Sequence, residues 1–317
     1  MPKPSNIPMT SSRRTLLTLA YPALTMIALL DPSAFAPFNE EELRSELSQK
    51  LHQHDPAQFP EQPLLADALA WADAFLKEKD FIYREQSQSN ISYLRSLNRT
   101  LEQGKDFITH TAGSRYPYRF QISETEHIEY YLQFPSRYNA DQAYPILIDL
   151  PGLGWLNKRL EFTALYGRNR HSGFIVLTPI NNETFWNYSK LDALLDRILT
   201  RLSIDHQRIY LMGHSLGGNG AWEWAKRRSN TFAAISPVSA WSNLDELDRL
   251  KNTPVLMVHG AKDFIIKIAW NLRPTNYLES HGGTVSKIIL PNAGHDVLDR
   301  STREKTVDWL LKHTRDA

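Results

Sequence analysis

One serine of this sequence stands in a setting that would make it a nucleophile. Ser215 lies at the centre of Gly213-His214-Ser215-Leu216-Gly217, a G-x-S-x-G pattern. The run 208–212 before it has the composition of a β-strand, and the stretch from Ala221 after it favours a helix. A serine on such a strand-to-helix turn projects from the carboxyl end of the strand, and the flanking glycines leave room where a Cβ would clash. Because the pattern alone is weak evidence, the surrounding elements and partner residues have to support it.

Two later segments offer an acid and a base for this serine. Asp263 follows the apolar run 254–259, and His295 follows the next apolar run, 284–290. If both runs are strands parallel to 208–212, the two side chains lie at the same edge of the sheet as Ser215. The chain order of serine, aspartate and histidine is also the order found in one large class of serine hydrolases. We therefore expect His295 to be the base and Asp263 the acid that orients it.

Other titratable residues near these segments are weaker candidates. Asp296 and Asp299 lie close to His295 in sequence, but neither follows the preceding strand, where the orienting acid belongs. His214 adjoins the nucleophile, and its side chain is expected to project away from it. His259 lies within a strand and is expected to pack in the core or to cap the turn. In the plainest alternative, Ser215 is an ordinary turn residue and His295 a surface histidine.

An acyl-transfer site also needs two backbone donors for the oxyanion. The N–H of Leu216, directly after the nucleophile, is the expected first donor. The second is expected from the loop after the apolar run 146–150. Pro151 has no N–H, so Leu153 or Gly152 must donate, and Leu153 is the preferred candidate.

The elements that must position these residues alternate between strand and helix from about residue 118 onward. This alternation predicts an α/β fold with a mostly parallel sheet, helices on both faces, and an antiparallel edge formed by 119–134. Before it, apolar residues recur at helical spacing within 64–75 and 91–101, which predicts an N-terminal helical extension. The expected strands are 127–134, 144–150, 173–179, 208–212, 232–238, 254–259 and 284–290, and the expected helices are 187–202, 218–228, 264–280 and 301–313.

The first 36 residues differ from the rest. Arg13 and Arg14 precede an apolar run over 16–30, and a small-x-small tripeptide ends at Ala36. This organisation predicts an export signal, and Ser12 to Leu17 partly matches a twin-arginine signal. Prolines at 22 and 37 argue against it, and the alternative is a buried N-terminal helix of a cytoplasmic protein. The expected domains are therefore a signal over 1–36, a helical extension over 37–117 and a catalytic domain over 118–317, in a periplasmic or secreted protein.

The charge balance and the lack of cysteine argue against several kinds of partner and of catalytic or metal site. The 317-residue chain has 36 Lys and Arg against 35 Asp and Glu, and no cysteine. The balance gives no electrostatic reason to expect nucleic acid as a partner, and the apolar run over 16–30 is too short to predict stable membrane insertion. Thiol catalysis, disulfides and cysteine zinc sites are excluded. His52 and His54 form an H-x-H with no third ligand nearby, so no metal site is expected there. The oligomeric state cannot be read from these features.

These motifs resemble a known family. The segments 208–222, His259 to Asp263 and Ala293 to Asp296 are similar to the esterase and "predicted peptidase" group of α/β hydrolases, which is related to dienelactone hydrolases, polyhydroxybutyrate depolymerases, feruloyl esterases and the catalytic domain of prolyl oligopeptidase. The likeness covers about 118–317. It implies the α/β-hydrolase fold and a Ser-His-Asp hydrolase that needs no metal or cofactor. Pro151 departs from the group, which usually has His before the glycine.

The expected substrate is a carboxylic ester of a small molecule, with an ester of a carbohydrate or of a phenolic compound as the candidates. Only 16 residues separate Pro237 from Pro254, too few for a cap domain at that point, so an open site mouth is expected. Trp155, Trp186 and Trp241 follow strands at the same edge and are candidate substrate-binding residues. Two alternatives stay open: a serine peptidase, and a non-catalytic binding protein built on the same fold.

Overall fold

The computed structural model describes residues 40–59, 62–77, 87–108, 112–152 and 173–315. By its internal contacts the chain divides into two compact units, Met1–Ser45 and Glu46–Ala317. The second unit contains the sheet and the elements that position the candidate site. The predicted export signal over 1–36 lies outside the described residues. Within those residues, no helix has the length and apolar character needed to cross a bilayer.

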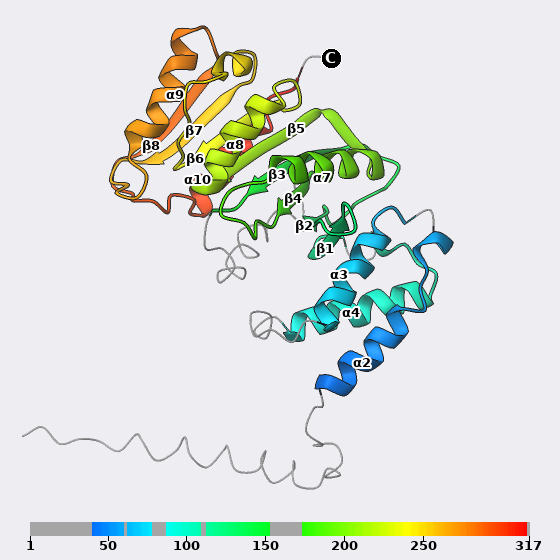
Figure 1. Cartoon of the computed structure of the whole chain (residues 1–317). Helices are drawn as coiled ribbons and strands as arrows, with labels where there is room; N and C mark the ends of the chain where they lie inside the picture. Colours follow the sequence, from blue (N-terminus) through cyan, green and yellow to red (C-terminus); the bar gives the residue numbers. More distant parts are fainter. Residues whose placement is uncertain (1–39, 60–61, 78–86, 109–111, 153–172, 316–317) are drawn as a thin grey trace, which may run out of the picture. The chain divides into compact units, whose positions relative to one another are not determined.

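The second unit is built on one eight-stranded sheet (Figure 1). Its strand order is β1-β2-β4-β3-β5-β6-β7-β8. The pairs from β4 to β8 are all parallel, whereas β1 and β2 form an antiparallel hairpin that joins β4 in antiparallel register. The prediction of a mostly parallel sheet is confirmed. The strands are β1 Arg115–Gln121, β2 His127–Gln133, β3 Tyr144–Leu150, β4 Ile175–Pro179, β5 Ile204–His214, β6 Ala234–Val238, β7 Val255–Gly260 and β8 Val285–Leu290.

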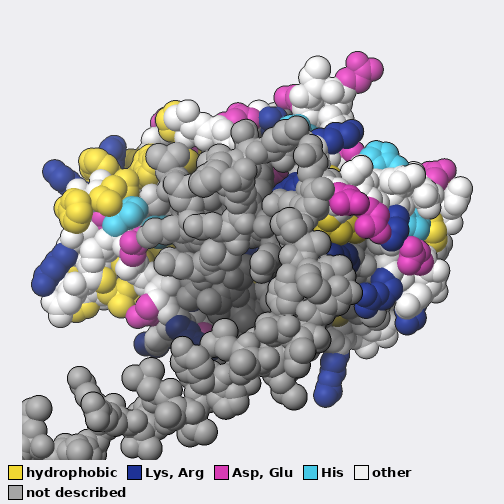
Figure 2. Space-filling model, turned by 90° about the horizontal axis from the view of Figure 1, so that it is seen from below, with side chains coloured by type: hydrophobic (Ala, Val, Ile, Leu, Met, Phe, Trp, Pro, Cys, Tyr) yellow, Lys and Arg dark blue, Asp and Glu magenta, His cyan; other side chains and the backbone are white. Residues whose placement is uncertain are grey.

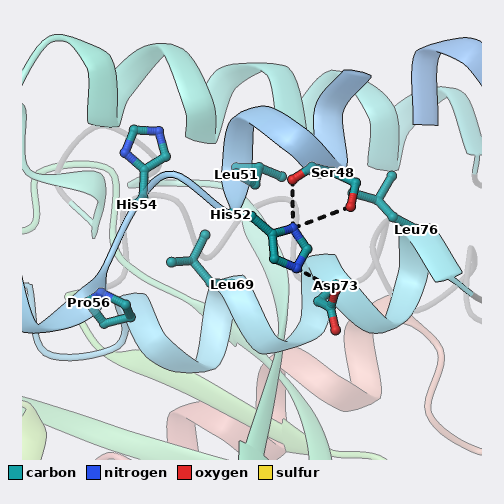
Figure 3. A pocket seen from close by; sticks show the side chains of 8 residues that line it. All are labelled: Ser48, Leu51, His52, His54, Pro56, Leu69, Asp73 and Leu76. Carbon is teal, nitrogen blue, oxygen red and sulfur yellow. Dashed lines mark hydrogen bonds and ion pairs between the residues drawn. The ribbon is translucent and has the colours of Figure 1, made fainter. Parts of the chain in front are cut away.

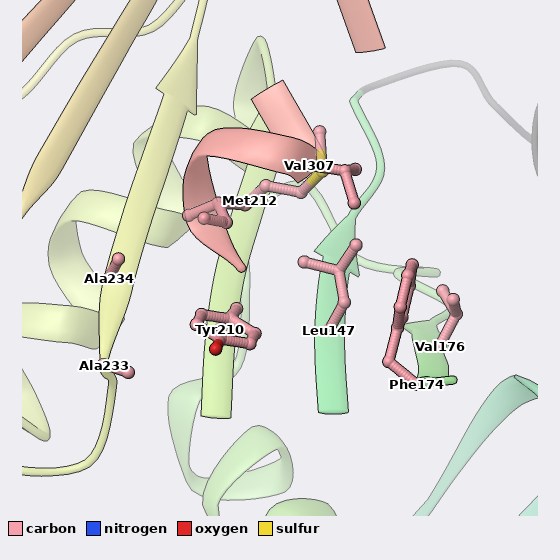
Figure 4. Close-up of a cluster of buried hydrophobic side chains, with 9 residues drawn as sticks. Leu147, Phe174, Val176, Tyr210, Met212, Ala233, Ala234 and Val307 are labelled. Atoms are coloured by element: carbon pink, nitrogen blue, oxygen red, sulfur yellow. The ribbon is translucent and has the colours of Figure 1, made fainter. Parts of the chain in front are cut away.

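Helices cover both faces of this sheet. Helices α7 (Tyr188–Arg201), α8 (Leu216–Arg227) and α9 (Ile268–Ser280) lie on one face, and α10 (Arg300–Leu310) lies on the other (Figure 1). Every residue of β3 and β4 is buried, which explains why these strands read as continuous apolar runs. On the α10 face, Val307 packs with side chains of four neighbouring strands, among them Leu147 of β3 and Met212 of β5 (Figure 4).

The helical segments before the sheet are α2 (Glu40–Leu51), α3 (Leu65–Lys77) and α4 (Ser87–Glu102), with a short 3-10 turn at Pro56–Gln58. The predicted apolar stripes of α3 and α4 are confirmed, because their members are buried. Asp67 of α3 is 3% exposed. It accepts hydrogen bonds from Tyr130 Oη of β2 (2.7 Å) and Arg197 Nε of α7 (3.2 Å). A buried carboxylate with these two partners attaches the helical extension to the sheet.

Several element boundaries differ from the prediction by one to four residues, and the starts of β5 and α9 are among the largest differences. Strand β5 begins at Ile204 rather than at 208, because Tyr144 of β3 pairs with Ile204 across a register shift. The residues between, 205–207, are polar, so their composition did not indicate a strand. Helix α9 begins at Ile268 rather than at 264. The N–H groups of Ile265 and Ile266 instead bond the side chain of Asp263, which holds this segment as a loop.

Candidate active site

The candidate nucleophile sits where β5 turns into α8. Ser215 is the N-cap of α8 and has φ 57° and ψ −118°, a conformation that residues with a side chain rarely adopt. The residues two positions before and two positions after it must be glycines: a Cβ on Gly213 would overlap the carbonyl oxygen of Gly217, and a Cβ on Gly217 would overlap that of Leu150. The N–H of Ser215 donates to the carbonyl of Val238 at 2.9 Å. The backbone is therefore strained at the one residue that a nucleophile elbow would strain.

The candidate acid lies in the loop after β7. One oxygen of Asp263, Oδ1, accepts hydrogen bonds from the N–H groups of Ile265 and Ile266, both at 2.9 Å. The other, Oδ2, lies 2.8 Å from Nδ1 of His295. Its side chain is fully buried in the fold. Burial alone would raise the pKa of Asp263, but the hydrogen bond from His295 and the two backbone donors outweigh it, so the pKa lies below its usual value. The acid is therefore held ionised and fixed in orientation.

The candidate base lies in the loop after β8. His295 has a side chain that is 13% exposed, so the ring is reached by solvent on one side. Its ring centroid lies 4.8 Å from that of His214, the residue directly before Ser215. The structure therefore brings Ser215, Asp263 and His295 to one edge of the sheet, as the chain order predicted. With Nδ1 facing the carboxylate of Asp263, the hydrogen sits on Nδ1 and a lone pair on Nε2.

The nearby residues considered as alternatives have other partners. His214 Nε2 lies 2.9 Å from the carbonyl oxygen of His295. Asp299 caps α10 by accepting from the N–H of Thr302 at 2.8 Å. His259 has no exposed surface, and its Nε2 lies 2.9 Å from the carbonyl of Ile266. The interpretation of His259 as a residue that packs and caps the turn is confirmed. Burial lowers the pKa of His259 and of His214, so both rings are neutral near pH 7.

The oxyanion donors are only partly described. Leu216 is the first residue of α8, and the first-turn N–H groups of a helix have no partner within it. A Cβ on Gly217 would also come within 2.7 Å of the carbonyl oxygen of Pro151, so the chain after β3 passes directly over the elbow. Leu153 lies outside the described residues. The start of the predicted oxyanion loop is thus at the elbow, on the side of α8 where an anion would be stabilised by the helix N-terminus.

The three candidate tryptophans have different surroundings. Trp155 lies outside the described residues. Trp186 is 6% exposed and packs against α8, where its Cδ1 would be 2.6 Å from a Cβ on Gly220. It also lines a cavity of about 280 Å³ with the 180–183 loop after β4. The carbonyl of Trp241 accepts a hydrogen bond from Asn219 Nδ2 of α8 at 3.1 Å. Both described tryptophans therefore contact the helix that begins at the candidate nucleophile.

An exposed apolar group beside the acid was missed at the level of sequence. Phe264 is 85% exposed and Ile265 53% exposed, directly after Asp263, and Trp270 of α9 is 49% exposed. On the face drawn in Figure 2, hydrophobic side chains gather toward the left. Apolar side chains that are exposed together can mark a ligand-binding surface. Three apolar residues in succession after the acid, at 264–266, were the signal available in the sequence.

A second serine, histidine and aspartate meet away from the sheet (Figure 3). His52 lies with Nδ1 2.7 Å from the carbonyl of Ser48 and 3.3 Å from its Oγ, and with Nε2 3.2 Å from Asp73 Oδ1. Because Nδ1 donates to the backbone carbonyl, it offers Ser48 no lone pair and cannot take its proton. This cluster lines a cavity of about 210 Å³ and does not form a second triad. Within the described part of the chain, no group of side chains is arranged to hold a metal ion.

Comparison with known proteins agrees with this architecture. No protein-family model matches the sequence. The chain is 35% identical over 195 residues to the bis(hydroxyethyl) terephthalate hydrolase of Streptomyces coelicolor, covering 56% of this chain and 59% of that protein. It is 30% identical over 175 residues to cutinase est2 of Thermobifida alba, covering 50% of this chain and 54% of that protein. The chain therefore spans little more than half the length of these curated relatives.

Solved structures show the same fold at low identity. A thermostable esterase superposes with a TM-score of 0.52 at 21% identity and covers 64% of each chain. A ferulic acid esterase superposes with a TM-score of 0.51 at 18% identity and covers 63% of this chain and 99% of its own. Porphyromonas gingivalis dipeptidyl peptidase 4 reaches 0.53 at 14% identity and covers 63% of this chain and 35% of its own. Together with the strand order and the strained elbow, these likenesses confirm the predicted fold: the chain is an α/β-hydrolase-fold protein.

Proposed function

We propose that this protein is a serine hydrolase that cleaves carboxylic esters through an acyl-enzyme. The observation that supports it most is the 2.8 Å contact between Asp263 Oδ2 and His295 Nδ1 at the sheet edge where Ser215 occupies a strained elbow. An imidazole oriented in this way presents the Nε2 lone pair that a general base needs. The proposal is also supported by the two relatives described above, an ester hydrolase and a cutinase.

The reaction has two steps on this arrangement. In the first, His295 takes the proton of the Ser215 hydroxyl as the oxygen attacks the ester carbonyl, and then gives that proton to the leaving alcohol. In the second, the same histidine activates a water that releases the acid from Ser215. Asp263, ionised and fixed by two backbone donors, stabilises the imidazolium in both steps. The residues proposed as oxyanion donors are Leu216 and Leu153, through their backbone N–H groups.

The proposed substrate is an ester with an aromatic or otherwise apolar part. Support comes from the exposed Phe264 and Ile265 beside the acid, and from Trp186 and Trp241 against α8. Trp155 belongs to the same proposal. The relative from Streptomyces is named for an ester of terephthalate, which combines an aromatic acid with short alcohols. Such a ligand would match flat side chains around the site mouth better than a charged one.

The direct test is labelling and turnover. A fluorophosphonate probe should label wild-type protein at Ser215, and Ser215→Ala should abolish both the label and hydrolysis of p-nitrophenyl acetate. Full hydrolysis by Ser215→Ala would refute the nucleophile. A wild-type protein that takes no label would favour a binding protein on the same fold.

A peptidase is the second candidate, because the same fold occurs in dipeptidyl peptidase 4. An ester and its matching amide with the same acyl group separate the two functions. We expect the ester to be cleaved and the amide to show no turnover above the rate of Ser215→Ala, since an amide demands far more transition-state stabilisation. Turnover of the amide that depends on Ser215 would favour the peptidase.

The proposal extends to organisation and location. We propose that residues 1–36 direct export to the periplasm or beyond, that 37–117 form the helical extension and that 118–317 form the catalytic domain. The basic and apolar pattern of the first segment supports export. N-terminal sequencing of protein recovered from the exported fraction tests it: an intact Met1 in that fraction would contradict cleavage after residue 36.

A further inference from the structure

The backbone carbonyl of His295 accepts two side-chain hydrogen bonds. His214 Nε2 lies 2.9 Å from this oxygen, and Ser239 Oγ donates to it at the same distance. Both side chains belong to buried residues: His214 is 6% exposed and Ser239 has no exposed surface. Two donors, one at the end of β5 and one directly after β6, thus converge on the backbone carbonyl of the candidate base.

The loop that holds this acceptor has no regular structure of its own. Strand β8 ends at Leu290 and α10 begins at Arg300, so His295 lies midway along an irregular connection. Such a loop does not position a side chain by its own hydrogen-bond ladder. The position of the imidazole therefore depends on what the loop is attached to, and the carbonyl of His295 is attached to His214 and Ser239.

The two donors are themselves fixed relative to the candidate nucleophile. His214 is the last residue of β5 and precedes Ser215 directly. Ser239 follows β6 with φ 45°, a left-handed conformation that is uncommon for serine, and its N–H donates to Val258 of β7 at 2.9 Å. The residue before it, Val238, accepts the N–H of Ser215 at 2.9 Å. One rigid segment of the sheet edge therefore bonds both the nucleophile and the backbone of the base.

The carbonyl of His295 determines which ring nitrogen of His214 carries the hydrogen. A carbonyl oxygen only accepts, so Nε2 of His214 must carry the hydrogen. That nitrogen is consequently unable to take a proton from Ser215. Through Nε2, His214 is thus a donor to the backbone of the base.

We propose that His214 and Ser239 are positioning residues that jointly hold His295 in reach of Ser215. This inference rests on the proposed function. A general base must lie within hydrogen-bond distance of its proton, and a displacement of about 1 Å can reduce the rate about a hundredfold. Since either donor alone still bonds the carbonyl, loss of both should cost more than the product of the two single losses.

The test is a double-mutant cycle on kcat. His214→Leu and Ser239→Ala should each lower kcat about threefold to tenfold, and the double variant should lower it by more than the product, about a hundredfold or beyond. KM should change little, because neither side chain is placed against substrate. His214→Gln should keep most of the wild-type kcat that His214→Leu loses, since a glutamine amide can donate from nearly the position of Nε2.

Ser236 provides a matched control. Its hydroxyl donates to the carbonyl of Leu256 at 2.9 Å, it is fully buried on β6, and it lies three residues from Ser239. Ser236→Ala therefore removes the same kind of buried bond without touching the base, and its kcat should stay within about twofold of wild type. If Ser236→Ala and Ser239→Ala lower kcat equally, the effect is one of general stability and the proposal is overturned. Wild-type kcat in a folded double variant would overturn it as well.

A measurement that does not need turnover separates this proposal from the proposed function. The proton between His295 Nδ1 and Asp263 should give a low-field proton NMR signal in wild type. The signal should persist in Ser236→Ala, stay visible in Ser239→Ala, where His214 still bonds the carbonyl, and broaden or vanish in the double variant. An unchanged signal in the double variant would refute the positioning role. Absence of any ester hydrolysis by wild type would instead refute the proposed function.

Discussion

The side-chain amide of Asn271 lies 3.2 Å from Nδ1 of His259, and this contact determines which nitrogen of a buried histidine carries the hydrogen. The amide nitrogen also donates to the carbonyl of Pro237, while the amide oxygen accepts from Trp222 Nε1. Because the amide donates to Nδ1, the hydrogen of His259 is on Nε2, 2.9 Å from the carbonyl of Ile266 and 3.3 Å from Asp263 Oδ2.

Asn271→Asp should therefore destabilise the fold although the two side chains are nearly the same shape. The carboxylate can donate neither to His259 nor to Pro237, and Asn271 has no exposed surface. We expect a loss of about 2–4 kcal/mol in the free energy of unfolding, measured by urea denaturation. Asn276→Asp on the exposed side of the same helix is the control and should change stability by less than about 0.5 kcal/mol. An equal loss of stability in Asn271→Asp and Asn276→Asp would contradict the conclusion that the Asn271 amide donates to Nδ1 of His259.

Asp263→Asn should lower kcat about a thousandfold or more on p-nitrophenyl acetate while the protein stays folded. An amide in place of the carboxylate neither fixes the Nδ1–H form of His295 nor stabilises its imidazolium. Asp299→Asn removes a carboxylate from the same region and keeps a good N-cap for α10, so its kcat should equal that of wild type. If only Asp299→Asn lowered kcat, Asp299 rather than Asp263 would be the acid that orients His295.

Stability should fall as the pH drops below about 6.5, because two buried histidines resist protonation. The pKa values of His214 and His259 lie below the ordinary 6.5, with burial as the main cause. In this range the unfolded chain binds more protons than the folded one, so the free energy of unfolding increases with pH. His214→Gln should flatten this slope between pH 5 and 7 in urea denaturation. A slope identical to wild type would show that His214 is not the group responsible.

Asp67→Asn should weaken the attachment of the helical extension. The buried carboxylate bonds Tyr130 and Arg197, and the substitution leaves the guanidinium without its charged partner. We expect a loss of about 2–4 kcal/mol in the free energy of unfolding. Asp73→Asn, at a carboxylate that is 36% exposed and paired with Lys77, should cost less than about 1 kcal/mol. A smaller loss for Asp67→Asn than for Asp73→Asn would contradict this account of the attachment.

Much of this architecture was predictable because it follows from local chemistry. The period of apolar residues indicated strands and helices, and the G-x-S-x-G pattern located the elbow at Ser215. The order of Ser215, Asp263 and His295 across successive parallel strands then placed them at one edge, since the carboxyl ends of such strands coincide. The predicted starts of β5 and α9 were wrong for different reasons. Strand β5 begins with polar residues, which gave no apolar strand pattern. Before α9, the side chain of Asp263 accepts backbone hydrogen bonds and keeps the segment out of the helix.

The fold class and the three residues of the candidate site could be predicted from the amino-acid sequence, because strand period, glycine positions and chain order are properties of the chain. The groups that support these three residues became known only from the folded structure. The bonds from His214 and Ser239 to the carbonyl of His295 join residues 81 and 56 positions apart. Their distances depend on how four strands pack side by side, and no local pattern encodes that packing.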